Sequence, residues 1–307
     1  GFVTASGTDG NSHGLYFGRK SLQSKSDRPP ILYASADAHY SIKKLADVQN
    51  FELRLIQSDV MGQMRMDDFE RQLDPDRPAL VVIAMGTTFK GAIDDQAAIR
   101  RVLRARLKAP AHVHLDAALF GGFLPYADGA GWQQVHQQIQ QFDSIAVSGH
   151  KFFGFDDPLG IFITTQATFE RLNPFQVAYL NDAVPTISCS RSAISPLKFW
   201  WKIRSTSRRE FRREANDLMD HATSLLASLK GLGIQAWKNP YSNTVFFERP
   251  PEDIMRRYDL APEQDPQLGK LAHLVVMPHV DDILNGFIRD MQRWKKGPGL
   301  AQLPARR

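Results

Sequence analysis

Short apolar runs alternate with amphipathic stretches through the first two-thirds of the chain. The apolar runs predict strands at Ile31–Ser35, Ala79–Met85, Ala111–Leu115, Ser144–Ser148 and Gly160–Thr165. Helical patterns lie between them at Ser41–Val48, Met66–Leu73, Asp95–Leu107 and Trp132–Gln141. Strands that are apolar almost throughout, alternating with helices, predict an α/β fold whose mostly parallel mixed sheet is covered on both faces. Ligands of such sheets bind beyond the carboxyl ends of the strands.

The pattern changes after residue 198. One face of a long helix is marked by Leu218, Ala222, Leu225, Leu226 and Leu229. Strands are then expected at Asn243–Glu248 and His273–Met277, and a helix at Asp281–Trp294. We therefore expect a large α/β domain over residues 1–198 and a small α+β domain over residues 199–307.

Composition and charge narrow the class of protein. The net charge of +5 is mild, and much of it comes from arginines at helical spacing, which predict a solvated face rather than a nucleic-acid site: Arg204, Arg208, Arg209, Arg212 and Arg213. No apolar run approaches the ~18 residues of a membrane span, so no membrane association is expected. Cys189 is the only cysteine, which excludes an intrachain disulfide and, without a signal-like start, favours the cytoplasm.

Two residues that follow predicted strands carry the most specific chemistry. Lys151 ends the run Ser148-Gly149-His150-Lys151, and Asp116 lies in His114-Leu115-Asp116-Ala117-Ala118. A lysine amine can condense with an aldehyde, and an aspartate can keep a heterocyclic nitrogen protonated. Pyridoxal phosphate (PLP) needs both groups from its protein. A buried aspartate is costly unless it is paired, which argues against a purely structural Asp116.

Three other segments have both a functional and a structural interpretation. Ser6-Gly7-Thr8 opens a helical stretch, where small residues and backbone N–H groups bind phosphate, although a turn with a helix cap has the same residues. His39 follows a predicted strand, where a lone histidine is usually a surface residue. Gly86-Thr87-Thr88 can place the Thr87 hydroxyl beside a ligand or simply form a capped turn.

These segments, in this order, resemble the group II PLP-dependent amino acid decarboxylases, and the bacterial PLP-type histidine decarboxylases most of all. The likeness covers the whole chain and continues through Gly86–Asp94, Thr186–Arg191, Ser242–Phe247 and Met277–His279. It implies the PLP-dependent transferase fold of type I and a homodimer with its active site at the subunit interface. It also implies decarboxylation of an L-amino acid, histidine or a related basic amino acid, to the amine and carbon dioxide.

The resemblance also implies roles for single residues. Lys151 would bind PLP covalently, Asp116 would pair with the pyridinium nitrogen, and His39 would stack on the ring and contact the substrate carboxylate. Tyr179 would protonate the α-carbon, unless it only packs, and Arg191 would lie near the substrate, with a structural ion pair as an equal alternative. The expected cofactor-binding residues are Ser6, Gly7, Thr8, His39, Thr87, Asp116, Ala118, Ser148, His150 and Lys151. No metal is expected.

Two segments depart from the family pattern. Relatives carry neutral residues after the lysine, whereas Phe152–Gly160 contains Asp156 and Asp157, and Ser190–Ala193 replaces Ser-Arg-Asn-Gly. A carboxylate of Asp156 in the pocket would favour a cationic side chain and widen the substrates to diamino acids. The alternative is that both aspartates lie on a surface turn beside Pro158.

The start of the chain also departs from the family. Family members have many residues before the phosphate loop, so we expect this chain to be a fragment, a truncated relative or half of a split enzyme. Two other functions stay open. One is a different PLP reaction in the same fold, such as carbon–carbon cleavage, oxidative deamination or transamination. The other is an inactive PLP-binding subunit that needs a partner chain.

Overall fold

The computed structural model describes residues 1–129, 141–171, 176–177, 182–183 and 186–296. Contacts between residues divide the chain into two compact units. The first comprises Gly1–Thr88 and Ala92–Ala215, and the second comprises Phe89–Gly91 and Asn216–Arg307.

The boundary between the units lies later than the expected residue 198. Phe199 packs against Phe153 with ring centroids 5.6 Å apart, and Phe211 packs against the same ring at 5.7 Å. These aromatic contacts hold helix α7 (Ile194–Ser205) and the start of helix α8 (Arg208–Gly231) in the first unit.

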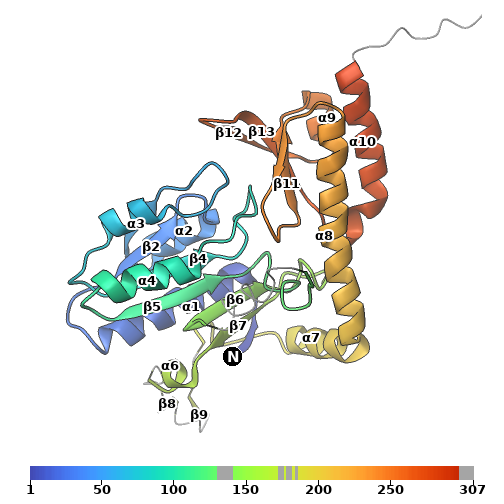
Figure 1. Ribbon diagram of the computed structural model, residues 1–307. Helices are drawn as coiled ribbons and strands as arrows, with labels where there is room; N and C mark the ends of the chain where they lie inside the picture. The colour runs from blue at the N-terminus through green and yellow to red at the C-terminus, as the bar shows by residue number, and fades with distance from the viewer. Residues whose placement is uncertain (130–140, 172–175, 178–181, 184–185, 297–307) are drawn as a thin grey trace, which may run out of the picture. The chain divides into compact units, whose positions relative to one another are not determined.

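The first unit is built on a seven-stranded sheet with the strand order β1-β7-β6-β5-β4-β2-β3 (Figure 1). Five neighbouring strands run parallel to one another: β3, β2, β4, β5 and β6. Strand β7 pairs antiparallel with β6, and β1 pairs antiparallel with β7. Their bounds are β1 Phe2–Thr4, β2 Ile31–Ser35, β3 Glu52–Ile56, β4 Ala79–Ala84, β5 Ala111–Asp116, β6 Ser144–Ser148 and β7 Gly160–Thr164. The predicted mostly parallel mixed sheet is confirmed.

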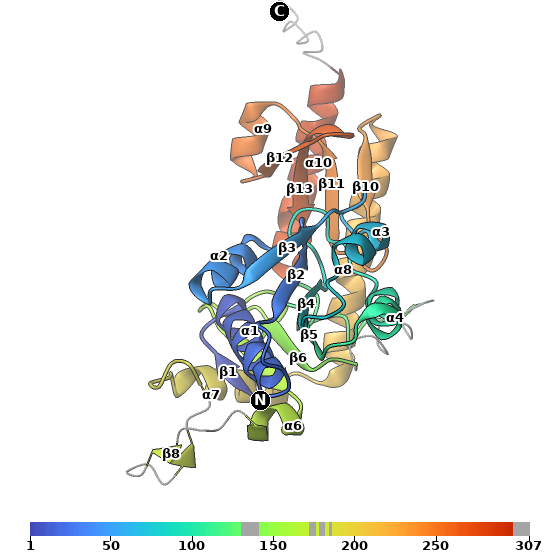
Figure 2. The ribbon, with the colours of Figure 1, turned by 90° about the vertical axis from the view of Figure 1, so that its left-hand side faces the viewer.

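Helices cover both faces of this sheet, as the apolar strands predict. Helices α1 and α2 lie on one face, and α3 and α4 lie on the other (Figure 2). The α2 side chains Ile42 and Leu45 join a buried cluster with Leu32 of β2, while Tyr33 of the same strand contacts Phe69 of α3 on the other face. The bounds are α1 Gly7–Gln23, α2 Tyr40–Val48, α3 Met66–Gln72, α4 Gln96–Arg106 and α6 Gln166–Arg171, and a two-stranded sheet pairs β8 Gln176–Val177 with β9 Asp182–Ala183.

The carboxyl ends of the central parallel strands lie along one edge of the sheet. Ala84 is paired in register with Asp116, and Asp116 with Ala146. The loops that leave β4, β5 and β6 therefore begin side by side, which is where the sequence places its candidate residues.

The second unit is an α+β arrangement. Its four-stranded antiparallel sheet has the order β10-β11-β13-β12. The apolar side of helix α10 packs on this sheet through the contact of Phe287 with Phe247, whose ring centroids are 5.7 Å apart. The bounds are β10 Ala236–Lys238, β11 Thr244–Glu248, α9 Glu252–Arg257, β12 Ala261–Asp265, β13 Gly269–Val275, the 3₁₀ turn η2 Pro278–Val280 and α10 Asp281–Lys296.

Several elements differ from the expectation. Strand β1 is only three residues long, and edge strand β3 contains Glu52 and Arg54, so neither has the apolar pattern of a buried strand. Strand β13 covers Gly269–Val275 rather than His273–Met277, because its polar first residues pair with β12 at the edge of the sheet. The expected helix Trp132–Gln141 lies, except for Gln141, outside the described residues.

Candidate active site

Strand ends of the first unit bring Asp116, Lys151 and His39 together. Asp116 is the last residue of β5, Lys151 follows β6, and His39 follows β2. The charge of Asp116 acts on both Lys151 and His39, and the charge of Lys151 acts on His39. The three candidate residues therefore share one electrostatic environment, as the sequence predicts.

Lys151 is a half-buried amine. Burial lowers the pKa of its ammonium group, and the nearby negative charge of Asp116 partly offsets that effect. Among the described residues, no hydrogen bond to the Lys151 side chain is found. A lysine with a lowered pKa has more of its amine in the neutral, nucleophilic form.

Asp116 is held at the edge of the sheet by backbone bonds. Its carboxylate accepts a hydrogen bond from the N–H of Ala118 at 3.2 Å, and its carbonyl oxygen accepts one from the N–H of Met85 at 2.9 Å. Only 7% of the residue is exposed. A carboxylate in this setting is fixed in place and stabilises a positive charge presented to it.

His39 caps the first turn of α2, and this cap determines its tautomer. Its Nδ1 accepts a hydrogen bond from the backbone N–H of Ser41 at 3.3 Å and lies 2.7 Å from the Ser41 hydroxyl. Because a backbone N–H can only donate, Nδ1 is unprotonated and Nε2 carries the proton. Burial lowers the pKa of the His39 imidazole, and the positive charge of Lys151 lowers it further, whereas the negative charge of Asp116 raises it. The net lowering favours the neutral form of the ring.

The amino-terminal end of α1 lies beside the same edge of the sheet. Ser6 caps the helix, with its hydroxyl accepting a hydrogen bond from the N–H of Asp9 at 3.1 Å. Gly7 is so close to β6 and the loop after β5 that a Cβ there would lie 2.3 Å from Ser148 Oγ and 3.1 Å from Ala118 Cβ. Thr8 is exposed. The first-turn N–H groups and the helix dipole make this end suitable for an anion.

Two further predicted residues serve the local backbone. Thr87 is buried, and its hydroxyl accepts a hydrogen bond from the N–H of Ala92 at 2.9 Å, which closes the turn after β4. Its hydroxyl hydrogen can still be donated to a ligand. His150 is exposed, and its Nδ1 lies 3.4 Å from the carbonyl oxygen of Leu159.

Asp156, a predicted substrate residue, and its neighbour Asp157 lie at the surface. Asp156 is 84% exposed and bonds to the Lys198 ammonium at 2.8 Å, and Asp157 contacts the same ammonium. Lys198 lowers the pKa of Asp156 by this hydrogen bond. The surface turn considered for these two aspartates is therefore what the structure shows.

Arg191 lies next to the first strand of the chain. Its guanidinium carbon is 5.5 Å from the Phe2 ring centroid, and its charge acts on Asp9. The role of Arg191 near the substrate stays a prediction, and so does the structural ion pair. Tyr179 lies outside the described residues.

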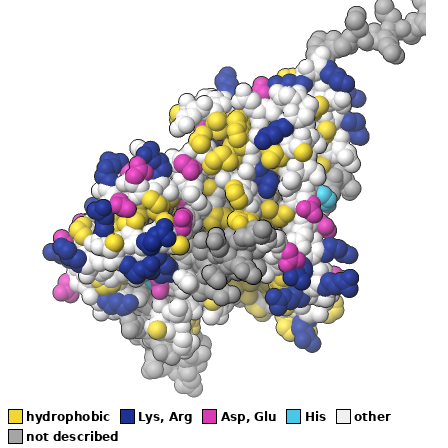
Figure 3. Space-filling model, viewed as in Figure 1, with side chains coloured by type: hydrophobic (Ala, Val, Ile, Leu, Met, Phe, Trp, Pro, Cys, Tyr) yellow, Lys and Arg dark blue, Asp and Glu magenta, His cyan; other side chains and the backbone are white. Residues whose placement is uncertain are grey.

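The helical arginines form a solvated face. All five, from Arg204 to Arg213, are exposed, and Arg212 makes a 2.6 Å ion pair with Asp128. At the surface shown in Figure 3, Lys and Arg side chains are interspersed with Asp and Glu. No helix within the described part of the chain is long and apolar enough to cross a bilayer.

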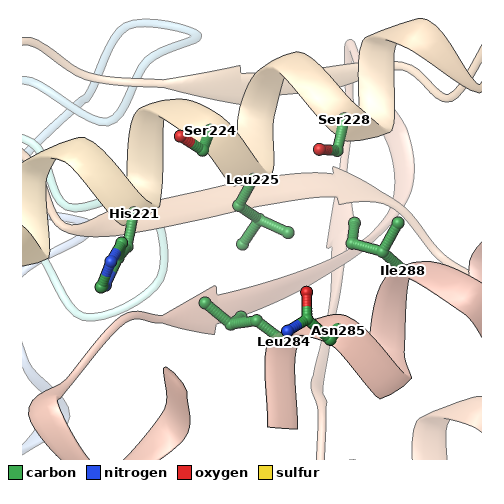
Figure 4. A pocket seen from close by; sticks show the side chains of 7 residues that line it. All are labelled: His221, Ser224, Leu225, Ser228, Leu284, Asn285 and Ile288. Carbon is green, nitrogen blue, oxygen red and sulfur yellow. The ribbon is translucent and has the colours of Figure 1, made fainter. Parts of the chain in front are cut away.

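A hollow of about 210 Å³ in the second unit is chemically unlike the strand-end site. Its walls come from α8 and α10 (Figure 4), and they consist of His221, Ser224, Leu225, Ser228, Leu284, Asn285 and Ile288. These side chains include neither a lysine to bind an aldehyde nor a carboxylate to pair with a ring nitrogen. The strand-end residues of the first unit are therefore the better candidates.

Comparisons with known proteins point to the same chemistry. The model of the pyridoxal-dependent decarboxylase conserved domain matches residues 18–234. Serine decarboxylase 1 of Oryza sativa subsp. japonica is 36% identical over 296 residues, and the alignment covers 95% of this chain and 58% of that protein. Histidine decarboxylase of Morganella morganii is 33% identical over 300 residues, with 94% of this chain and 76% of that protein covered.

A solved structure has the same fold. L-methionine decarboxylase from Streptomyces sp. 590 superposes with a TM-score of 0.77 at 20% identity, covering 95% of this chain and 77% of that chain. The chain thus spans 58% of the rice relative and about three-quarters of the Morganella relative.

Proposed function

Because the chain belongs to the pyridoxal-dependent decarboxylase family, we propose that it carries the cofactor site of an enzyme that removes the α-carboxyl group of an L-amino acid as carbon dioxide. The observation that carries this proposal is the half-buried Lys151 amine, whose charge interacts with those of Asp116 and His39. The three side chains leave the sheet at the edge where ligands of α/β folds bind.

The residues present fit PLP group by group. Lys151 supplies the amine for the aldehyde, and Asp116 supplies the carboxylate for the ring nitrogen. The α1 amino terminus supplies N–H groups for the phosphate, beside the Ser148 hydroxyl. Only a residue without a side chain fits at Gly7, so the backbone itself can approach the phosphate there. When bound, PLP supplies the electron sink that accepts the electron pair left by departing carbon dioxide.

The protein's own side chains then have separate tasks. Asp116, fixed by Ala118, would hold a proton on the ring nitrogen. Lys151 would hold the cofactor through its amine until the substrate amine takes its place. His39, oriented by its cap on α2, would restrain the ring and offer its Nε2–H to the substrate carboxylate. Tyr179 remains the proposed proton donor to the α-carbon.

Histidine is the first substrate candidate, and serine is the second. Relatives with both names share about a third of their residues with this chain. The main argument for diamino acids as substrates was a carboxylate in the pocket. That argument is lost, because the carboxylates of Asp156 and Asp157 bind Lys198 at the surface. We also propose, from the family resemblance, that two copies of the chain form the active unit.

The test is to incubate the purified chain and PLP with a panel of L-amino acids that includes histidine, serine, methionine and ornithine. Amine and carbon dioxide in equal amounts support the proposal, and the best substrate identifies the side chain. Ketone, aldehyde or pyruvate products would instead indicate another PLP reaction. No product from any amino acid, restored by adding a second polypeptide, would indicate the PLP-binding subunit alternative.

A further inference from the structure

A buried chain of hydrogen bonds joins the central sheet to helix α1. His112 Nε2 lies 3.0 Å from Ser144 Oγ, which lies 2.9 Å from His114 Nδ1. His114 Nε2 in turn lies 3.0 Å from Asn11 Oδ1 of α1. All four residues are at most 2% exposed, so none of these bonds competes with bulk water.

The protons of this chain can be placed in one consistent order. Because Asn11 Oδ1 only accepts, His114 Nε2 donates to it, and Nδ1 of the same neutral ring is an acceptor. The Ser144 hydroxyl therefore donates to His114 and accepts from His112 Nε2. Burial lowers the pKa of His112 to about 4 and that of His114 to about 3, so both rings are neutral near pH 7.

The same residues determine how closely α1 approaches the sheet. A Cβ at Gly14 would lie 2.2 Å from the His114 ring, and one at Gly18 would lie 2.9 Å from the His112 ring. Toward the amino terminus, a Cβ at Gly7 would lie 2.3 Å from Ser148 Oγ. The glycines thus bring the helix onto β5 and β6. Packing of glycines without side chains does not fix the position of the helix along its own axis. A directional bond to Asn11 does, since a shift of one residue moves the helix by about 1.5 Å.

The network also lies on the face of β5 that leads to the site. Residues two apart in a strand share a face, so His112, His114 and Asp116 lie in one row. Helix α1 covers His112 and His114, and its amino terminus lies beside Ala118 and Ser148, next to Asp116. Any axial displacement of α1 is therefore a displacement of its first-turn N–H groups relative to Asp116.

We propose that His114, Ser144 and Asn11 are positioning residues for the cofactor phosphate. They fix α1 along its axis so that its amino-terminal N–H groups meet the phosphate while the ring nitrogen meets Asp116. This inference rests on the proposed function, because it assumes that the α1 amino terminus receives the phosphate. None of the three residues touches the cofactor.

The test compares PLP with pyridoxal, which has the same ring and aldehyde but no phosphate. Dissociation constants of both are measured by absorbance for wild type, Asn11→Ala and Ser144→Ala, below their thermal unfolding transitions. We expect the dissociation constant of PLP to rise about tenfold in both variants and that of pyridoxal to stay within about twofold, because the lost bonds act only through the phosphate end. Ser21→Ala removes another buried hydroxyl from α1 without touching the network and should change neither constant.

Failure of the positioning role and failure of the proposed function give different results. Equal weakening of PLP and pyridoxal in the variants would show a general structural role and overturn the inference, as would unchanged PLP binding. Asn11→Ala gives the same comparison if Ser144→Ala does not fold. If wild type itself binds pyridoxal as tightly as PLP, the phosphate site, and the proposed function with it, is wrong.

Discussion

Lys90 is buried, Lys151 is half-buried, and each lies near an aspartate, but their surroundings differ. Lys90 bonds to Asp265 at 2.6 Å, and the other carboxylate oxygen of Asp265 accepts the N–H groups of Gln267 and Leu268, each at 2.8 Å. Lys151 is influenced by the charge of Asp116, but no hydrogen bond between the two is found among the described residues.

The difference separates a hydrogen-bonded pair from a pair for which only a charge interaction is found among the described residues. In the second unit, both carboxylate oxygens of Asp265 accept hydrogen bonds, one of them from Lys90, so the pair is held in one geometry. In the first unit, the pKa of the Lys151 ammonium is lowered by burial and its nitrogen is not committed to Asp116. A buried titratable group with unused hydrogen-bonding capacity is typical of a functional site.

The largest effect is expected at Lys151. Lys151→Ala should reduce decarboxylation to background, by at least about a thousandfold, because it removes the amine that is proposed to bind the cofactor aldehyde. Lys108→Ala, at an exposed lysine of the same unit, should leave the rate unchanged. Steady-state carbon dioxide release measures both variants. Residual activity above about one per cent in Lys151→Ala would contradict the assigned role.

The structural pair should instead determine stability. Lys90→Met leaves Asp265 buried without its cation and should lower the free energy of unfolding by about 3–5 kcal/mol. Lys270→Met, at an exposed lysine of β13, is the matched control and should change it little. Chemical denaturation gives both values. A loss in Lys90→Met no larger than in the control would show that the buried pair does not stabilise the second unit.

Asp116→Asn should weaken catalysis without removing the cofactor. A neutral amide no longer holds the proton on the ring nitrogen, so kcat should fall by about a hundredfold. Asp143→Asn changes an aspartate that accepts the N–H of Val113 in the same sheet, and it should retain most activity. Full activity with bound PLP in Asp116→Asn would assign the ring nitrogen to another residue.

The smallest effect is expected at the exposed aspartates. Asp156→Asn and Asp157→Asn should leave the ratio of kcat/KM for histidine to that for ornithine within about twofold, because both carboxylates bind Lys198 at the surface. The two substrates are assayed in competition in one mixture. A selectivity change in either variant would return that carboxylate to the substrate pocket.

The central strands, and the placement of Asp116 and Lys151 at strand ends, could be predicted from the sequence, because buried parallel strands are apolar throughout. Ile31–Ser35 and Ser144–Ser148 are predicted at their observed bounds. Lys151 follows β6, and Asp116 is the last residue of β5. Edge strand β3 could not be predicted, since one exposed edge allows charged residues in a strand.

The polar network between β5 and α1 was also missed. His112 and His114 alternate in a buried strand, and that spacing was the available signal. The partners of His114 lie far from it in the chain, Asn11 by 103 residues and Ser144 by 30 residues. Only tertiary packing brings these side chains together.

One measurement tests the central claim most directly. PLP is added to the purified chain, the mixture is reduced with borohydride, and the modified lysine is located by peptide mass spectrometry. The account predicts the mass of reduced PLP on Lys151 and none on Lys90, although both lysines lie near aspartates and Lys90 is the more buried of the two. Modification of Lys90, or of any lysine in place of Lys151, would contradict it.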